Sequence, residues 1–183
     1  MKISVVIPCF NEKDTISEII EKVKKENKYN KEIIVIDDFS TDGTREILND
    51  KISEKIDKII LNDKNFGKGY SVRRGVKEAT GDIILIQDAD LEYDPFDYPR
   101  LIEPIIKGNA DVVYGSRFIG GNGPKRLHFF WHSVANKILT FLTNIFINLN
   151  MTDMETGYKV FTKKVKDSIS FECNRFGFEP EIT

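Results

Sequence analysis

The sequence contains few cysteines, few histidines and no long apolar run. Its 183 residues include two cysteines, Cys9 and Cys173, which cannot form a disulfide framework, so we expect a reduced compartment. No run of about 20 apolar residues without charge occurs, so no segment is expected to cross a bilayer. The formal net charge of -2 provides no overall attraction for nucleic acid, and no nucleic-acid partner is expected.

The overall composition is that of a globular protein. Apolar residues make up 40% and charged residues 31%, which excludes disordered and fibrous classes. The length suits a single domain over residues 1–183 with a real core. Met1 and Lys2 lead directly into strand-like sequence, so no signal peptide is expected. The sequence of the final stretch 176–183 gives no sign of a closing helix or cap, and we expect the domain to be cut short there.

Short apolar runs alternate with helical patterns as far as residue 117. This alternation predicts an α/β fold with a mostly parallel sheet flanked by helices, because parallel strands need crossover helices. Helices are expected from residue 16, through 47–48, up to residue 79 and from residue 95. Strands are expected at 3–7 (ended by Pro8), 33–36, 59–61, 83–86 and 111–114.

Two carboxylates follow the most apolar of these strands. Asp88 and Asp90 come directly after the run 83–86, at the strand end where open α/β sheets bind ligands. Two aspartates at this spacing can share a hard cation such as Mg²⁺ or Mn²⁺, and Glu92 could add a third oxygen. Such a pair in a loop can also be plain solvated surface. We favour the metal site, which would suit a diphosphate.

A second acidic pair, Asp37 and Asp38, follows the strand 33–36. A carboxylate accepts hydrogen bonds from a base or ribose but repels phosphate, so Asp38 would read the nucleoside end of a ligand. The alternative is a helix cap, which Thr41 or Asp42 can provide. The turn Gly67-Lys68-Gly69 lacks Walker spacing and is expected to let the backbone pass close to a ligand.

Basic residues follow the last predicted parallel strand. Arg117 comes just after the strand 111–114, and Lys125 and Arg126 follow on a glycine-rich loop. Arg117 and this pair offer cations for phosphate oxygens, although Lys125 and Arg126 could also be ordinary surface charges. His128 and His132 have the spacing of a zinc pair but no third ligand nearby, so we interpret them as residues of a helix face.

The stretch 124–151 is expected to contain a long amphipathic helix. Its apolar residues recur every three or four positions, which is typical of one helical stripe. A basic pair before an aromatic-rich apolar face suits a helix at a membrane interface. A large core or a dimer contact remains equally open. The stripe consists of Leu127, Phe130, Trp131, Val134, Ile138, Phe141, Leu142, Ile145 and Leu149.

Several motifs, in order, resemble a known family. The stretches 4–12 (SVVIPCFNE) and 35–44 (VIDDFSTDGT), followed by Asp88-Ala89-Asp90, look like family 2 glycosyltransferases of the GT-A fold. Gly115-Ser116-Arg117 and the turn 153–158 narrow the resemblance to the branch of dolichyl-phosphate mannose synthases and related polyprenyl-phosphate glycosyltransferases. The resemblance covers nearly the whole chain.

This resemblance implies a GDP- or UDP-hexose donor, inversion at the sugar carbon, a Mg²⁺ or Mn²⁺ ion, and a polyprenyl or dolichyl phosphate acceptor. It also implies peripheral membrane contact at the cytoplasmic face. Two positions depart from the branch: Glu92 stands where Gln is common, and the turn 153–158 reads DMETGY rather than the usual D-x-x-S-G-F. The implied sites are nucleotide binding by Pro8, Phe10, Glu12, Asp37, Asp38, Gly67 and Lys68, metal binding by Asp88, Asp90 and Glu92, catalysis by Asp88, Asp90 and Arg117, and acceptor phosphate binding by Arg117, Arg126 and Ser133.

Proton chemistry also bears on the acceptor class. Inverting transfer to a hydroxyl needs a base, whereas a phosphate is already ionised near neutral pH. Family members that extend polysaccharides carry a Glu-Asp pair followed by Gln-x-x-Arg-Trp, and neither pattern occurs here. A transferase that acts on a saccharide or other hydroxyl is the alternative enzyme. A nucleotidyltransferase would need a basic glycine-rich loop at 8–12, where this chain has PCFNE. The alternative that is not an enzyme is a nucleotide-sugar-binding or membrane-adaptor module without catalysis.

Overall fold

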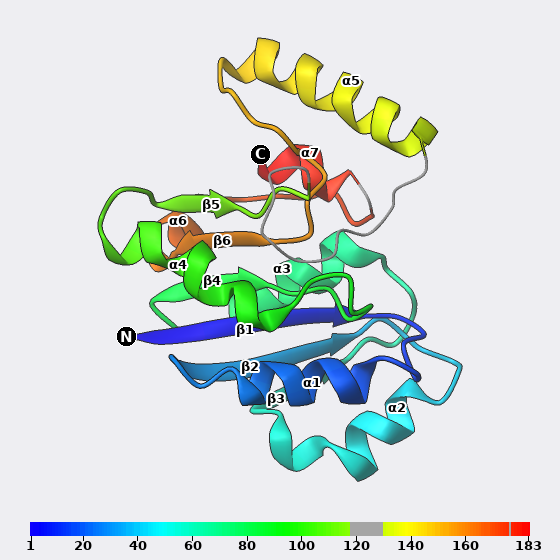
Figure 1. The fold of residues 1–183 in the computed structure, drawn as a ribbon. Helices are drawn as coiled ribbons and strands as arrows, with labels where there is room; N and C mark the ends of the chain where they lie inside the picture. The colour runs from blue at the N-terminus through cyan, green and yellow to red at the C-terminus, as the bar shows by residue number, and fades with distance from the viewer. Residues whose placement is uncertain (118–129, 176) are drawn as a thin grey trace.

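A central mixed sheet organises the chain (Figure 1). The computed structural model describes residues 1–117, 130–175 and 177–183. In these residues the sheet has six strands in the order β3-β2-β1-β4-β6-β5. The strands are β1 (Lys2–Cys9), β2 (Asn30–Asp37), β3 (Lys58–Leu61), β4 (Ile83–Ile86), β5 (Val112–Tyr114) and β6 (Lys159–Thr162). The helices are α1 (Ile16–Lys25), α2 (Thr44–Glu46), α3 (Lys68–Glu78), α4 (Tyr98–Ile106), α5 (Phe130–Ile147), α6 (Lys163–Ser168) and α7 (Phe178–Ile182), with short turns η1 (Ile47–Lys51), η2 (Ser53–Lys55) and η3 (Pro95–Asp97).

Strand direction brings the predicted site residues to one edge of the sheet. The strands β1 to β4 are mutually parallel, and β6 pairs antiparallel with both β4 and β5. The strand β5 therefore runs in the direction of β4, and its carboxyl end lies at the same edge. The turn before β6 starts from that edge as well. The predicted mostly parallel α/β sheet is confirmed.

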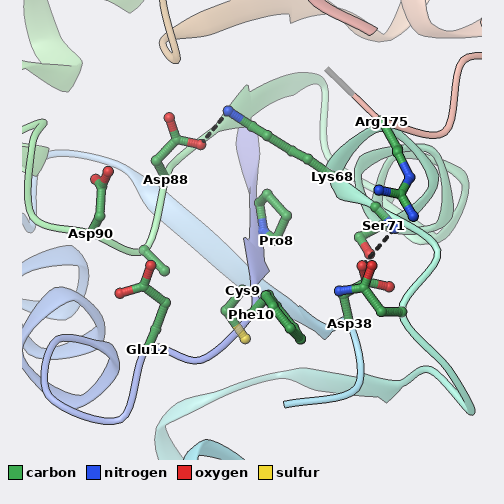
Figure 2. Close-up of a pocket in the computed structure, with 13 residues that line it drawn as sticks. Pro8, Cys9, Phe10, Glu12, Asp38, Lys68, Ser71, Asp88, Asp90 and Arg175 are labelled. Carbon is green, nitrogen blue, oxygen red and sulfur yellow. Dashed lines mark hydrogen bonds and ion pairs between the residues drawn. The ribbon is translucent and has the colours of Figure 1, made fainter. Parts of the chain in front are cut away.

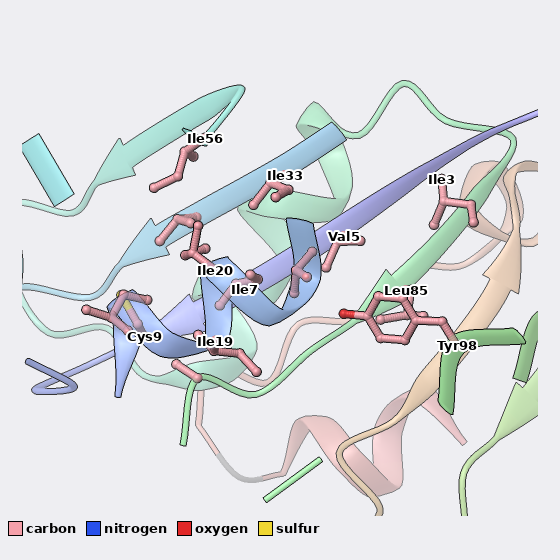
Figure 3. Close-up of a cluster of buried hydrophobic side chains, with 14 of the residues drawn as sticks. Ile3, Val5, Ile7, Cys9, Ile19, Ile20, Ile33, Ile56, Leu85 and Tyr98 are labelled. Atoms are coloured by element: carbon pink, nitrogen blue, oxygen red, sulfur yellow. The ribbon is translucent and has the colours of Figure 1, made fainter. Parts of the chain in front are cut away.

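The sheet is buried on both faces, which explains the continuous apolar runs. On one face, Ile3, Val5 and Ile7 of β1 pack with Ile19 and Ile20 of α1, as Figure 3 shows. On the other face, alternate strand residues pack against α3 and the C-terminal segment. That second cluster includes Val6, Ile34, Ile36, Val72, Val76, Ile84, Ile86, Phe161, Phe171 and Phe178.

The last residues, expected to lack a closing helix, form α7 over Phe178–Ile182, so that expectation is wrong. Two predicted boundaries also differ from the structure. Pro8 does not end the first strand, because β1 continues to Cys9 with Pro8 opposite Ile36. The pairing of β1 with β4 ends at Val6, so at Pro8 the strand is paired with β2 alone. A residue without an N–H is tolerated at such a position.

The predicted helix over 124–151 is the second difference. Its residues 124–129 lie outside the described part, and α5 ends at Ile147, before a left-handed Asn148 with φ 54°. No helix in the described ranges has the length and apolar character needed to span a membrane.

Candidate active site

A pocket of about 560 Å³ opens at the carboxyl edge of β1, β2 and β4 (Figure 2). Four of its lining residues are acidic and two are basic, so an added cation would be favoured there. Asp90 and Glu12 lie at one end, and Arg175 and Asp38 at the other. The lining residues are Pro8, Cys9, Phe10, Glu12, Asp38, Asn65, Gly67, Lys68, Ser71, Asp88, Ala89, Asp90 and Arg175.

The loops after β1 and β2 are joined by side chain–backbone hydrogen bonds. The backbone N–H of Asn11 donates to Ser40 Oγ at 2.9 Å, and the N–H of Glu12 donates to Thr44 Oγ1 at 2.9 Å. Burial and the nearby carboxylates of Asp90 and Asp42 raise the pKa of Glu12 against a hydrogen bond from Thr15. Glu12 is therefore a partly buried carboxylate that other carboxylates repel, and a bound cation would relieve this repulsion.

The two aspartates after β2 have different surroundings. Asp38 is buried at the pocket wall and accepts hydrogen bonds from Asn62 Nδ2 at 2.7 Å, the Phe66 N–H at 3.0 Å and the Gly67 N–H at 2.6 Å. Asp37 is fully buried, is ion-paired with Arg45 at 2.5 Å, and does not line the pocket. Asp38 thus fixes the glycine turn at the pocket, whereas Asp37 fixes its own loop.

The glycine turn passes against the C-terminal segment. Gly67 has φ 102°, and a methyl group there would lie 2.5 Å from the carbonyl oxygen of Asn174. A methyl group at Gly69 would lie 2.2 Å from the carbonyl oxygen of Cys173. Both positions therefore require glycine. This close approach places Lys68 at the start of α3, with its ammonium group 2.8 Å from Asp88 Oδ1.

The acidic pair after β4 lies at the pocket, but Glu92 does not. Asp88 and Asp90 both line it, whereas Glu92 is exposed, outside the lining, and donates its backbone N–H to Asp90. No cluster of three or more His, Cys, Asp or Glu able to hold a metal exists among the residues the structure describes. The two carboxylates fit the oxygen preference of Mg²⁺ or Mn²⁺, and further ligand oxygens would have to come from a bound molecule.

Arg117 is held by a buried carboxylate rather than projecting freely. Its Nε and one terminal nitrogen each lie 2.8 Å from the oxygens of Asp153, and its backbone N–H donates to Asp153 at 3.0 Å. Burial would raise the pKa of Asp153, but the hydrogen bonds from Arg117 and Asn136 outweigh it and lower that pKa. The pair fixes the orientation of the guanidinium group.

The helix α5 reverses the usual arrangement of polar and apolar faces. Asn136 and Thr140 are 4% and 5% exposed; Asn136 Nδ2 donates to Asp153 at 2.7 Å, and the Thr140 hydroxyl donates to Asn136 at 2.9 Å. By contrast, Trp131, Phe141 and Phe146 are 75%, 63% and 84% exposed. A polar stripe therefore faces the protein and the apolar stripe faces outward, with α5 set apart from the sheet (Figure 1).

The turn before β6 joins both sides of the edge. Its Asp153 holds Arg117, and its Gly157 packs so closely on Asp88 that a methyl group would lie 2.1 Å from Asp88 Oδ2. Lys159, almost fully buried, donates to the carbonyl oxygens of Thr156 at 2.7 Å and Met154 at 3.3 Å. Burial lowers the pKa of Lys159 to about 8.

The pocket also contains residues that sequence reasoning missed. Arg175, Ser71, Asn65 and Cys9 line it, although Cys9 lies within the motif 4–12. The local sequence around Arg175 carries no signal, because Arg175 reaches the pocket only through the packing of its segment on α3. The polar spacing of Asn136, Thr140 and Asn144 was a usable signal of an inward-facing stripe. Among the predicted acceptor residues, Ser133 lies half-buried in the first turn of α5, and Arg126 falls outside the described residues.

Residues 4–169 match the family described as Glycosyl transferase family 2. The chain belongs to this family. The resemblance inferred from the motifs is confirmed. The family 2 chain is 32% identical to the dolichol-phosphate mannosyltransferase of Pyrococcus furiosus over 182 residues, which covers 98% of this chain and 51% of that protein.

Other relatives extend the comparison. The undecaprenyl-phosphate 4-deoxy-4-formamido-L-arabinose transferase of Aeromonas hydrophila is 27% identical, covering 97% of the family 2 chain and 54% of the relative. The chain thus spans about half the length of these curated relatives. A solved glucosyl-3-phosphoglycerate synthase from Mycobacterium tuberculosis, in complex with Mn²⁺, UDP and glucosyl-3-phosphoglycerate, has a TM-score of 0.77 at 21% identity. The match covers 99% of this chain and 63% of the chain of the synthase. The expected GT-A fold is confirmed.

Proposed function

We propose that this chain carries an inverting, metal-dependent transfer of a hexose from GDP- or UDP-sugar to a polyprenyl or dolichyl phosphate. The observation that carries the proposal is one sheet edge with an acidic pocket and, beside it, an arginine fixed by a buried carboxylate. The donor side comprises Pro8, Phe10, Glu12, Asp38, Gly67, Lys68, Asp88 and Asp90. The acceptor side comprises Arg117, Ser133 and Arg126.

Each side has chemistry that suits its proposed ligand. Phe10 offers an exposed ring to a nucleobase, and Asp88 with Asp90 would hold Mg²⁺ or Mn²⁺. The metal, when bound, would stabilise the charge of the leaving diphosphate. Arg117 would hold the acceptor phosphate, whose oxygen is already ionised and attacks without a base. The names of the Pyrococcus and Aeromonas relatives support this acceptor class.

The proposal includes contact between α5 and the cytoplasmic face of the membrane that carries the acceptor. Its polar stripe is satisfied by the protein while its aromatic stripe faces outward, which suits lipid rather than water. Phe141→Ser with Phe146→Ser should weaken sedimentation with anionic vesicles at unchanged monomer size. A dimer in gel filtration that the double variant dissociates, with no vesicle binding by the parent, would contradict membrane contact.

The enzymatic proposal is tested by nucleoside diphosphate release. GDP- and UDP-hexoses are first screened by thermal shift with Mn²⁺ to find the donor. Release from that donor should then rise when polyprenyl phosphate is added and stay at background with soluble sugars. Stimulation by a sugar and not by the lipid phosphate would favour the hydroxyl-acceptor alternative.

A further inference from the structure

Lys68 lies between two carboxylates at the centre of the site. Its ammonium nitrogen is 2.8 Å from Asp88 Oδ1 and 3.2 Å from Glu179 Oε1. Figure 2 shows the side chain reaching over Pro8 to Asp88. Burial alone would lower the pKa of Lys68, but the two carboxylates outweigh it and raise that pKa, so the group stays charged. The Lys68 ammonium group thus already forms an ion pair with Asp88, a predicted metal ligand.

The other oxygen of Asp88, Oδ2, lies against the backbone of Gly157. A methyl group at Gly157 would lie only 2.1 Å from Asp88 Oδ2. Lys68 contacts the remaining oxygen, Oδ1. A divalent ion at Asp88 would therefore lie beside the Lys68 ammonium group, and the two cations would repel each other.

Glu179 offers Lys68 a second position. Its side chain is 9% exposed, and its Oε2 has no hydrogen-bond partner within the described part of the chain. A buried acceptor without a donor is costly, so a position of the Lys68 ammonium group that gives this oxygen a donor would recover part of that cost. An ammonium group that leaves Asp88 can bind the second oxygen of Glu179 without leaving the pocket wall.

The C-terminal segment that carries Glu179 is held against α3, so we infer that the lysine side chain is the group that moves. The C-terminal segment is fixed to α3 by Tyr70 N–H to Asn174 O at 3.1 Å and by Arg73 to Phe171 O at 3.1 Å. The close approach at Gly69 adds backbone packing. Asp88 is likewise fixed by Gly157.

We propose that Lys68 is an internal counter-ion that occupies Asp88 until the diphosphate of the donor arrives, so that metal and nucleotide bind together. This rests on the proposed function. A metal ion that binds alone must displace Lys68 toward Glu179, and no added negative charge offsets the repulsion between the two cations. A diphosphate supplies negative charge that both the metal and Lys68 contact. Lys68 therefore weakens binding of the metal alone and strengthens binding of the nucleotide with metal.

The test measures Mn²⁺ affinity by electron paramagnetic resonance, with and without the nucleoside diphosphate identified by the screen. The variant is Lys68→Met with Glu179→Gln, which removes the ion pair without leaving a buried unpaired carboxylate. Mn²⁺ alone should bind about tenfold more tightly than in the parent, and the nucleotide with saturating Mn²⁺ about tenfold more weakly. The matched control is Lys64→Met with Glu172→Gln, which removes the same two charges at exposed positions. It should change neither affinity.

A single variant, Glu179→Gln, keeps the inference testable if the double variant does not fold. Loss of the second carboxylate leaves Lys68 with Asp88 alone, so Mn²⁺ alone should bind more weakly than in the parent. Unchanged or weaker Mn²⁺ binding by a folded double variant, or unchanged binding by Glu179→Gln, would overturn the counter-ion inference while the parent still binds nucleotide with metal. A parent that binds no nucleoside diphosphate with Mn²⁺ would overturn the proposed function as well.

Discussion

The proposed donor side of the site is held by the sheet, whereas the side chain of Arg117, on the proposed acceptor side, is held by side chains from distant segments. Asp38, Asp88 and Asp90 follow buried parallel strands within one to four residues. Arg117 also follows a strand, β5, by three residues, but that strand is only partly buried, and the Arg117 side chain is held by Asp153 from a turn, which Asn136 of α5 supports. Backbone pairing therefore positions the proposed donor residues, and a buried polar network positions the arginine proposed for the acceptor. The acceptor side should be the more sensitive to single polar substitutions.

The largest effect on stability is expected from Asp153→Asn. The change replaces the buried carboxylate of the Arg117–Asp153 ion pair with a neutral amide, so the free energy of unfolding should fall by about 3 kcal/mol. Urea unfolding measures the difference. Asp167→Asn, which breaks an exposed ion pair with Lys163, is the control and should leave the midpoint unchanged. Equal midpoints for Asp153→Asn and the parent would remove the contrast between the two sides.

The donor side should respond in binding rather than in folding. Asp90→Asn removes one of the two carboxylates proposed for the metal, so Mn²⁺-dependent nucleotide affinity should fall by about a hundredfold. Isothermal calorimetry measures it, with Asp63→Asn, an exposed carboxylate outside the pocket lining, as control. If Asp90→Asn bound the nucleotide as the parent does, the metal assignment would be wrong.

A smaller effect is expected where α5 joins the network. Asn136→Leu removes the hydrogen bond to Asp153 and leaves the Thr140 hydroxyl without its acceptor, at a cost of about 1.5 kcal/mol. Urea unfolding compares it with Lys137→Gln on the exposed face of the same helix, which should match the parent. A matching result for Asn136→Leu would mean that α5 does not support Arg117.

The smallest effect on stability should come from the apolar face of α5. Phe146 is 84% exposed, so Phe146→Ser should change the free energy of unfolding by less than about 0.5 kcal/mol. Thermal unfolding by circular dichroism checks this. A loss comparable with that of Asn136→Leu would show that the outward face packs against protein, and the membrane proposal would lose its basis.

The same contrast explains what the sequence could predict. The apolar runs around Val5, Ile34 and Ile84 identify buried strands, and strand ends are where carboxylates converge, so the pocket around Asp38, Asp88 and Asp90 followed from periodicity. The pairing of Arg117 with Asp153 joins residues 36 positions apart and follows no local rule. The role of Arg175 is likewise a product of tertiary packing.

The helix α5 shows the limit of the pattern most clearly. Apolar spacing predicted a helix over 124–151, within which α5 lies, but left open whether the apolar stripe faces the core. The buried Asn136 and Thr140 decide that point, because their hydrogen bonds hold the polar stripe inward. Whether lipid covers the outward stripe stays a prediction.

The most direct test of the account follows a radiolabelled hexose. The protein is incubated with labelled GDP- or UDP-hexose, Mn²⁺ and polyprenyl phosphate in detergent, and the products are partitioned between chloroform and water. The account predicts that label enters the organic phase only with the lipid phosphate and metal present, and that Asp90→Asn abolishes it. Label transferred solely to water-soluble saccharides would contradict the proposed acceptor.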